Sequence, residues 1–247
     1  MPLFLDLETT GLNKAGDDEP VEIAIIDSSG EEVFCSLVRP VNRVSWPRAE
    51  EIHGIGPGQV KDMPTWATIE PIALEIMQRD LVVTYNAPFD LSFFDLSDCR
   101  IRYACAMRRL SDLRERDGLG DRWLTLSDAA ALAGYDLAYA HDAKEDARAC
   151  RALWTWLDDY ERKLNEKEAK RASRAAARSV NHAARMAMLA SNVLLSESRK
   201  LHPDEIPENS FSASQILKTR RESERWIIAG QARCWNGYYD VYVPAEC

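Results

Sequence analysis

The sequence predicts an α/β fold, in which a mixed sheet combines an antiparallel meander with parallel strands and is flanked by helices. The meander is indicated by three apolar runs near residues 3–8, 21–27 and 31–38, which only turns separate. The parallel strands are indicated by the continuous apolar run at residues 81–85, which follows a helical pattern and is typical of a buried strand reached by a crossover. An α-helical C-terminal extension and a small α+β tail complete the prediction.

Local signals define the other elements of this α/β region. Residues 13–20 and 28–30 predict turns, and residues 39–64, rich in proline and glycine, predict irregular structure. A short strand is predicted at residues 100–105. The predicted helices, each with a helical apolar spacing or a typical end signal, cover residues 65–78, a segment starting near Pro88, 107–116, 124–133 before Gly134, and 142 to about 160.

The composition is ordinary for a soluble globular protein, with 247 residues, 46% hydrophobic and 29% charged. The sequence shows neither a secretory signal nor an apolar run near the roughly 20 residues that span a bilayer, so no membrane association is expected. The six cysteines are scattered without a CxxC pair, which predicts reduced thiols in a cytoplasmic protein and no structural zinc site.

The charge is divided unevenly along the chain. The net charge is −9, but residues 161–200 carry ten Lys or Arg against four Asp or Glu, while the first 160 residues carry a net −13. An acidic body with a basic arm differs from a uniformly acidic protein. We therefore predict a domain at residues 1–160, a basic helical arm at 161–201 and a small C-terminal element at 202–247.

Two acids in the first strand predict a metal site. Asp6 and Glu8 lie two residues apart, so on a strand both carboxylates point to one face. Like charges that close repel unless a cation lies between them, and carboxylate oxygens suit Mg²⁺ or Mn²⁺. The alternative is an edge strand with two solvated acids.

Three further polar residues lie where strands end or helices begin. Asp90 is expected in the first turn of a helix that follows the strand at residues 81–85, which is where open α/β sheets bind ligands. Asp146 is expected one turn into a helix that Asp142 caps, and His141 lies just before that cap. The alternative for both acids is helix capping, worth about 0.3–1 kcal/mol, and His141 alone would be structural or exposed.

These motifs resemble a known family. Asp-x-Glu-Thr-Thr, then Asn-x-x-Phe-Asp, then His-x4-Asp, in this order over about residues 1–160, are similar to the DEDDh group of DnaQ-like 3′–5′ exonucleases, which includes the proofreading ε subunit of DNA polymerase III, RNase T and exonuclease X. Residues 52–55 are similar to the IHGI segment of the family. The resemblance implies an RNase H-like fold and two ions of Mg²⁺ or Mn²⁺.

The resemblance also implies a role for each acid and for the histidine. Asp6 would bridge both ions, Glu8 and Asp146 would hold the ion that activates water, and Asp90 would hold the other. His141 would act as the general base, since an imidazole exchanges protons near neutral pH.

Five further residues are predicted to bind the substrate. Asn86 and Phe89 would contact the terminal nucleotide, although Phe89 is equally suited to the core. Thr9 and Thr10 could donate hydrogen bonds to the scissile phosphate, or could instead cap the turn. His53 is a loop residue that could line the substrate path. Glu22 interrupts an apolar strand and needs a buried partner, but the sequence gives it no role.

The C-terminal third resembles nothing that we can name. Residues 161–201 lack Gly and Pro and predict a long helix. Its basic residues could bind phosphates, or it could be solvated, or it could pack on a protein partner or a second copy through Ala175, Met186, Leu189, Val193 and Leu194. Residues 212–228 predict a helix and residues 238–243 a strand. For the aromatic residues there, we favour a small core over stacking on bases. These residues are Trp226, Trp235, Tyr238, Tyr239 and Tyr242.

The sequence thus predicts a metal-dependent 3′–5′ exonuclease that binds nucleic acid 3′ ends and releases nucleoside 5′-monophosphates, with single-stranded DNA favoured. One alternative is a 3′–5′ exoribonuclease, because the residues that would distinguish a 2′-hydroxyl are not specified. Another is a catalytically idle nuclease-like module that binds a replication or repair partner. The complete carboxylate set argues against this last alternative, because a binding module gains nothing from so much repulsion.

Overall fold

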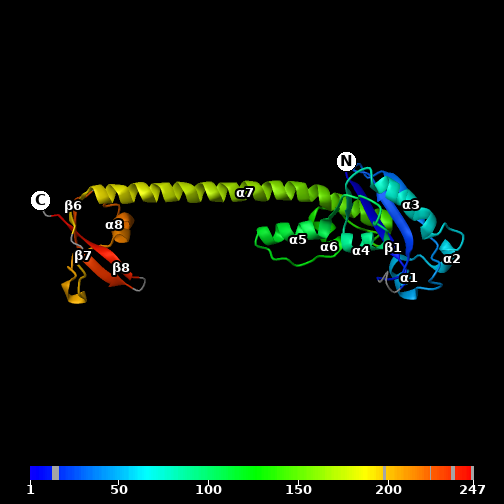
Figure 1. The fold of residues 1–247 in the computed structure, drawn as a ribbon, viewed down its shortest axis with the longest axis horizontal. Helices are drawn as coiled ribbons and strands as arrows, with labels where there is room; N and C mark the ends of the chain where they lie inside the picture. The colour runs from blue at the N-terminus through cyan, green and yellow to red at the C-terminus, as the bar shows by residue number, and fades with distance from the viewer. Residues whose placement is uncertain (13–16, 197–198, 223, 235–236, 246–247) are drawn as a thin grey trace. The chain divides into compact units, whose positions relative to one another are not determined.

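The computed structural model describes residues 1–12, 17–196, 199–222, 224–234 and 237–245 (Figure 1). The chain divides into two compact units, residues 1–165 and 166–247. Across the described residues, no helix combines the length and the apolar character that crossing a bilayer would require. The predicted turn at residues 13–20 lies partly outside the described residues, as do Trp235 and Cys247.

The first unit contains a five-stranded sheet with strand order β3-β2-β1-β4-β5. Strand β1 pairs antiparallel with β2 and parallel with β4, so the predicted mixed sheet is confirmed. Its elements are β1 (Leu3–Thr9), β2 (Pro20–Ile26), β3 (Glu32–Leu37), α1 (Pro47–His53), α2 (Pro57–Val60), α3 (Trp66–Met77), β4 (Val82–Thr84), α4 (Ala87–Asp90), the 3-10 turn η2 (Leu91–Phe93), β5 (Tyr103–Cys105), α5 (Ala106–Arg116), α6 (Leu126–Leu132) and the start of α7 (Ala143–Ser191).

The two faces of the sheet carry different helices because side chains alternate along β1. Leu3, Leu5 and Leu7 belong to the cluster that contains the apolar residues of α3. Phe4 points to the other face, into a cluster with the apolar residues of α5 and the first turns of α7. Asp6 and Glu8 share the side of β1 with Phe4, so this alternation places both acids under the beginning of α7.

The segment at residues 39–64 is more regular than the sequence predicted. It contains the short helices α1 and α2, each of which has a proline in its first turn, where a missing N–H costs nothing. Gly54 ends α1 in the left-handed conformation, with φ of +74°. The prolines and glycines that suggested irregular structure therefore mark helix ends instead.

Helix α7 is one continuous element of 49 residues rather than the two predicted helices. Residues 143–191 include no glycine or proline, so no residue interrupts it. It ends ten residues before the predicted end at residue 201. The side chains of Ser191 and Asn192 donate hydrogen bonds to the carbonyl of Met188 at 2.8 and 2.9 Å, which satisfies an orphan carbonyl of the last turn.

The second unit packs a three-stranded sheet, with strand order β6-β7-β8, against two helices. Residues 226–228 form a strand, not the predicted end of a helix, because this aromatic and β-branched run pairs with both neighbouring strands. Its elements are the end of α7, β6 (Val193–Ser196), the 3-10 turn η3 (Pro203–Glu205), α8 (Ala213–Thr219), β7 (Trp226–Cys234) and β8 (Gly237–Pro244).

The aromatic residues of the second unit divide between core and surface. Trp226 and Tyr242 are buried together with Leu189 and Ile216. Tyr238 and Tyr239 are exposed. The predicted small core therefore exists, but it takes only part of the aromatic set.

Candidate active site

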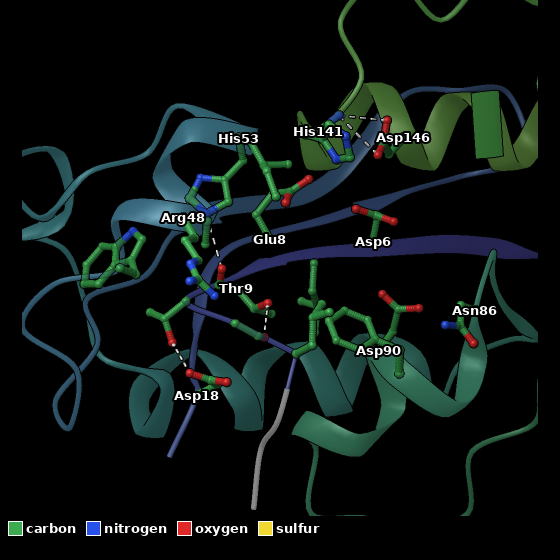
Figure 2. A pocket seen from close by; sticks show the side chains of 18 of the residues that line it. Asp6, Glu8, Thr9, Asp18, Arg48, His53, Asn86, Asp90, His141 and Asp146 are labelled. Carbon is green, nitrogen blue, oxygen red and sulfur yellow. Dashed lines mark hydrogen bonds between the residues drawn. The ribbon is translucent and has the colours of Figure 1, made fainter. Parts of the chain in front are cut away.

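A cavity of about 890 Å³ opens where the C-terminal end of β1 meets α1, α4 and the start of α7. Figure 2 shows its side chains. All ten residues predicted to form the site line it, namely Asp6, Glu8, Thr9, Thr10, His53, Asn86, Phe89, Asp90, His141 and Asp146. The structure thus brings the predicted residues together, and their individual roles remain predictions.

The four acids come from three different elements. Asp6 and Glu8 lie on β1, Asp90 is the last residue of α4, and Asp146 is in the first turn of α7. In Figure 2, Asp6 lies between Asp146 and Asp90. Each charge therefore acts on the others, and the negative potential is concentrated at the cavity wall.

Burial raises the pKa of every acid in this cluster. Desolvation raises the pKa of Asp6 well above its usual range, and the charges of Asp90 and Asp146 raise it further. Burial also raises the pKa of Glu8 to about 8, that of Asp90 to about 7 and that of Asp146 to about 6. Near neutral pH the folded protein would therefore hold protons on Asp6 and Glu8, and a cation that binds there would displace them.

The donor set fits a hard divalent cation. One ligand atom each from Glu8, His141 and Asp146 lie within 4.8 Å of one another, and Asp6 is coupled to Glu8 and Asp146 through its charge. Carboxylate oxygens dominate this set, as Mg²⁺ and Mn²⁺ prefer. No cysteine is among the residues that line the cavity, so a soft metal has no thiolate there.

Asp90 has a buried partner that sequence reasoning missed. The hydroxyl of Thr84, at the end of β4, donates a hydrogen bond to a carboxylate oxygen of Asp90. This bond opposes the rise that burial causes in the pKa of Asp90. Thr84 is completely buried, and a polar residue closing an apolar run was the only signal in the sequence that could have found it.

His141 has a constrained backbone and an exposed side chain. Its φ of +68° lies in the left-handed region, which few residues other than glycine adopt. Its backbone N–H points to the carboxylate of Asp146, at 3.3 and 3.4 Å from the two oxygens. This contact fixes the turn before α7, and the imidazole is left accessible beside the acids.

Glu22, for which the sequence gave no role, stabilises the start of α7. Its carboxylate accepts the backbone N–H of Ala143 at 3.2 Å, and Asp142 accepts that of Glu145 at 3.0 Å. Two carboxylates therefore cap one helix N-terminus, where negative charge is favourable. Glu22 is also the cross-strand neighbour of Glu8, so it ties β2 and β1 to α7.

His53 ends α1, and the chain occupies both nitrogens of its ring. Nδ1 accepts the backbone N–H of Ile55 at 3.0 Å, which leaves Nε2 as the donor to the carbonyl of Thr9 at 3.2 Å. Burial lowers the pKa of this imidazole. His53 therefore holds the end of β1 against α1 and has no free nitrogen for proton transfer.

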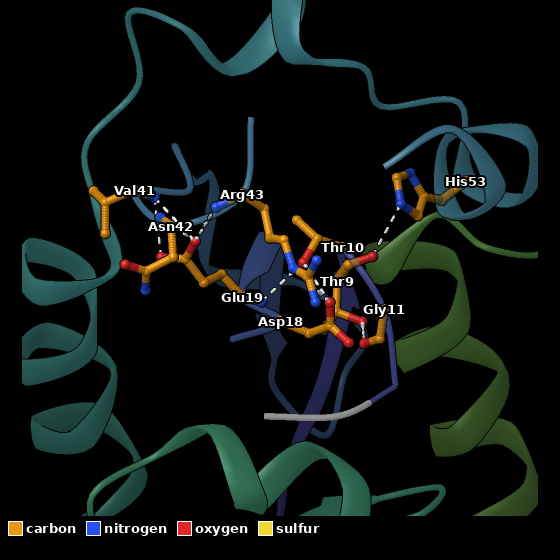
Figure 3. Close-up of polar contacts among 9 residues, drawn as sticks. All are labelled: Thr9, Thr10, Gly11, Asp18, Glu19, Val41, Asn42, Arg43 and His53. Atoms are coloured by element: carbon orange, nitrogen blue, oxygen red, sulfur yellow. Dashed lines mark hydrogen bonds and ion pairs between the residues drawn. The ribbon is translucent and has the colours of Figure 1, made fainter. Parts of the chain in front are cut away.

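The two threonines after Glu8 also bond within the chain (Figure 3). Thr9 donates from its hydroxyl to the carbonyl of Gly11 at 2.7 Å. The hydroxyl of Thr10 donates to Asp18 at 3.3 Å and accepts the N–H of Glu19 at 2.9 Å. These contacts correspond to the turn-capping alternative, and binding of the scissile phosphate by either threonine stays a prediction.

Two arginines at the cavity are additions that the sequence did not single out. Arg43 pairs with Asp18 at 3.2 Å. Arg48 is exposed, and Figure 2 shows its side chain extending from α1 toward Thr9. In the sequence, only their position near the IHGI segment pointed to the site. Both arginines place positive charge at an otherwise acidic cavity.

Asn86 and Phe89 approach the cavity from the start of α4. Phe89 packs edge-to-face on Phe93 with ring centroids 5.3 Å apart, and it also lines the cavity. Phe89 is therefore half-buried between the core and the cavity, and its contact with a substrate stays a prediction.

Comparison with known proteins identifies the family. A family model described as an exonuclease, RNase T, matches residues 3–153. The chain is 35% identical over 163 residues to an uncharacterized exonuclease of Escherichia phage 186, covering 59% of this chain and 82% of the phage protein. It is 28% identical over 174 residues to the DNA polymerase III subunit epsilon of Treponema pallidum (strain Nichols), covering 65% of this chain and 77% of that protein.

A solved structure agrees with these relatives. Exonuclease X in complex with 5′ overhanging duplex DNA has a TM-score of 0.51 and 25% sequence identity, covering 64% of this chain and 92% of that chain. The predicted RNase H-like fold is thereby confirmed. The family match, which spans more than half of the sequence, and the agreement of relatives and fold show that the chain belongs to the DnaQ-like 3′–5′ exonuclease family.

Proposed function

We propose that the protein is a metal-dependent 3′–5′ exonuclease that removes nucleoside 5′-monophosphates from the 3′ end of single-stranded DNA. The observation that carries this proposal is the convergence of four acids and one histidine on a single cavity. Its volume of about 890 Å³ falls in the usual range for small-molecule sites and suits a terminal nucleotide. The predicted cytoplasmic location remains part of the proposal.

Asp6, Glu8, Asp90 and Asp146 would hold two ions of Mg²⁺ or Mn²⁺. Bound there, the ions would supply charge for the phosphate and a more acidic water. Their presence would also offset the repulsion that raises the pKa values of the carboxylates.

The remaining chemistry belongs to the side chains around the acids. His141 accepts the proton of the water whose oxygen attacks the terminal phosphorus. The bond from phosphorus to the 3′ oxygen breaks, and that oxygen leaves with a proton from solvent. Asn86 and Phe89 hold the departing nucleotide, and the cation of Arg48 approaches its phosphate.

DNA is favoured over RNA by the proteins to which the chain is similar. The relative from Treponema pallidum is named as a DNA polymerase subunit, and the Exonuclease X structure contains duplex DNA. An exoribonuclease is the alternative, and contacts to the 2′-hydroxyl would distinguish the two substrates.

The test is degradation of oligonucleotides with a label at either end. With Mg²⁺, 5′-labelled single-stranded DNA should shorten stepwise, and the 3′-labelled strand should release labelled mononucleotide at once. The same strands as RNA compare the two substrates, and Asp6→Asn and a chelator serve as inactive controls. Internal cuts, shortening from the 5′ end, or activity that survives chelation would overturn the proposal.

A further inference from the structure

We propose that the exposed part of α7 in the second unit binds the sugar-phosphate backbone of the nucleic acid through one basic face. This inference rests on the proposed function, since it concerns the same polyanionic substrate. Residues 169–184 of α7 are all exposed. Between Ala169 and Ser196 the sequence contains no Asp or Glu, although it contains five Lys or Arg.

The basic residues of this stretch lie on one side of the helix. Their spacings of three and four residues bring them to one face. The basic stripe, as we name it, consists of Lys170, Arg171, Arg174, Arg178 and His182. Twelve residues separate its ends, so it extends for about 18 Å along the helix axis. Such a linear array of cations matches a linear array of phosphates.

The opposite face of the same stretch is made of small residues. Ala172, Ala176, Ser179 and Ala183 recur there at helical spacing. Neither face contacts a hydrophobic cluster of the described residues until Leu189. The segregation of charge is therefore a property of the exposed helix, and the small core of the second unit does not impose it.

Lys170, Arg171, Arg174 and Arg178 have no ion-pair partner among the described residues. Arg185, further along the helix, shows the contrast. It forms an ion pair with Glu222 and also donates to the carbonyl of Leu217, which anchors α7 to α8 and to the loop after it. The chain thus neutralises the arginine that it uses for packing and leaves the stripe open to solvent.

The occupant we infer is nucleic acid, because of the charge of the rest of the chain. The first 160 residues carry a net −13, and a protein with that charge repels a polyanion at long range. An enzyme that processes such a substrate needs a cationic surface outside its acidic cavity. The stripe offers phosphate-binding side chains and no aromatic residue for stacking, so its contacts are independent of base sequence.

The test compares two variants that each remove four charges from the second unit. The first changes Lys170, Arg171, Arg174 and Arg178 to Gln, which has nearly the same helix propensity. The matched control changes the exposed residues Lys218, Arg220, Arg225 and Arg233 to Gln. Both carry Asp6→Asn to prevent degradation, and circular dichroism checks that helix content is retained.

Binding of a fluorescent 30-nucleotide single strand is measured by anisotropy between 50 and 200 mM salt. Each lost phosphate contact lowers the slope of log affinity against log salt by about 0.7. The stripe variant should therefore lose about 2–3 units of slope and bind at least tenfold more weakly at low salt, and the control should change by less than one unit. Equal slopes for the two variants would overturn the inference.

Activity separates this inference from the proposed function. In the chain with Asp6 intact, thymidine 5′-(4-nitrophenyl phosphate) reaches only the cavity, so the stripe variant should hydrolyse it as the parent does. On the 30-nucleotide strand the KM of the stripe variant should rise about tenfold. A parent that hydrolyses neither substrate contradicts the proposed function, while the binding slopes still test the stripe.

A stripe that acts only in self-association would also overturn the inference. In that case the stripe variant would change the molar mass measured by light scattering without changing DNA binding.

Discussion

The protein contains two clusters of like charge, and their surroundings give them different electrostatic properties. The acidic cluster of Asp6, Glu8, Asp90 and Asp146 lies in the wall of a cavity, where desolvation raises the pKa values of its members. The basic stripe of α7 lies in solvent, where each like-charge pair at helical spacing costs only about 0.2–0.5 kcal/mol and salt screens it. We propose a resident cation as the counterion of the first cluster and a transient polyanion as that of the second.

The comparison predicts which treatment affects each region. A buried charge is screened little by salt and is sensitive to whether its ligand is present, so a chelator should act on the acidic cluster. An exposed charge is screened strongly, so salt should act on the stripe. The following experiments test that division, in decreasing order of expected effect.

Asp6→Asn should reduce the single-turnover rate on single-stranded DNA by about 10³-fold or more, because the change removes the carboxylate that we propose to bridge both cations, whose charge would supply several kcal/mol of transition-state stabilisation. Asp62→Asn, at an exposed acid that pairs with Lys61 at 3.8 Å and does not line the cavity, is the matched control and should keep the parental rate. An Asp6→Asn enzyme within tenfold of the parent would remove the distinction between a half-buried carboxylate of the acidic cluster and an exposed one.

His141→Gln should reduce kcat by about 10²–10⁴-fold and should flatten the acid limb of the pH–rate profile, because it removes a proton acceptor. His53→Gln is the informative partner variant, since both ring nitrogens of His53 are already bonded. It should lower the melting temperature and keep the shape of the pH profile. If His53→Gln flattened the pH profile and His141→Gln only lowered the melting temperature, the roles of the two histidines would be exchanged.

The metal-free protein should lose stability as the pH rises. The unfolded carboxyls titrate near pH 4, whereas the folded pKa values of Glu8, Asp90 and Asp146 are about 8, 7 and 6. The folded state binds more protons between these limits, so the stabilisation is complete below about pH 4 and is lost as the pH rises through 6 to 8.

This effect is measured by melting in a chelator at pH 5.5 and at pH 8.5. One unit of pKa shift is worth about 1.4 kcal/mol, and 1 kcal/mol moves the midpoint of a chain of this size by about 2–4 °C. Mg²⁺ should raise the midpoint most at the higher pH, and Glu8→Gln should reduce the pH dependence. A midpoint in chelator that is independent of pH would contradict a buried, repulsive cluster.

Glu22→Ala should have the smallest effect, a loss of about 0.5–2 kcal/mol in the free energy of unfolding, because the N–H of Ala143 loses its acceptor. Glu22→Gln keeps an acceptor oxygen and removes a charge near Glu8, so it should be close to the parent. Chemical denaturation of both variants measures the difference. Equal losses would show that the charge of Glu22, not its hydrogen bond, stabilises α7.

The sequence predicted the parts of the site that depend on local periodicity. Asp6 and Glu8 share a face because strand side chains alternate, and Asp146 follows a recognisable capping pattern. The resemblance to the exonuclease family indicated that these separate motifs form one site. The role of Glu22 was missed because its partner, Ala143, is 121 residues away in the sequence. Thr84 lies only six residues before Asp90, but a polar residue closing an apolar run is a weak signal.

The errors in secondary structure have a similar origin. Trp226 was placed in a helix because local propensity is weak, and pairing with both β6 and β8 overrides it. The prediction extends α7 past Ser191, but the side chains of Ser191 and Asn192 satisfy the carbonyl of Met188 in the last turn and help to end the helix there. Strand pairing therefore determines the structure at Trp226, and capping determines where α7 ends. Composition decides neither.

The left-handed backbone at position 141 has a consequence for protein engineering. Glycine is the residue that adopts this conformation most readily, and yet the chain carries histidine there. Selection of variants for heat resistance alone would have little reason to retain the imidazole and could replace it without visible harm to the fold. A stabilised library should therefore be screened for turnover at the same time, since its most stable members can be those that lack the proposed proton acceptor.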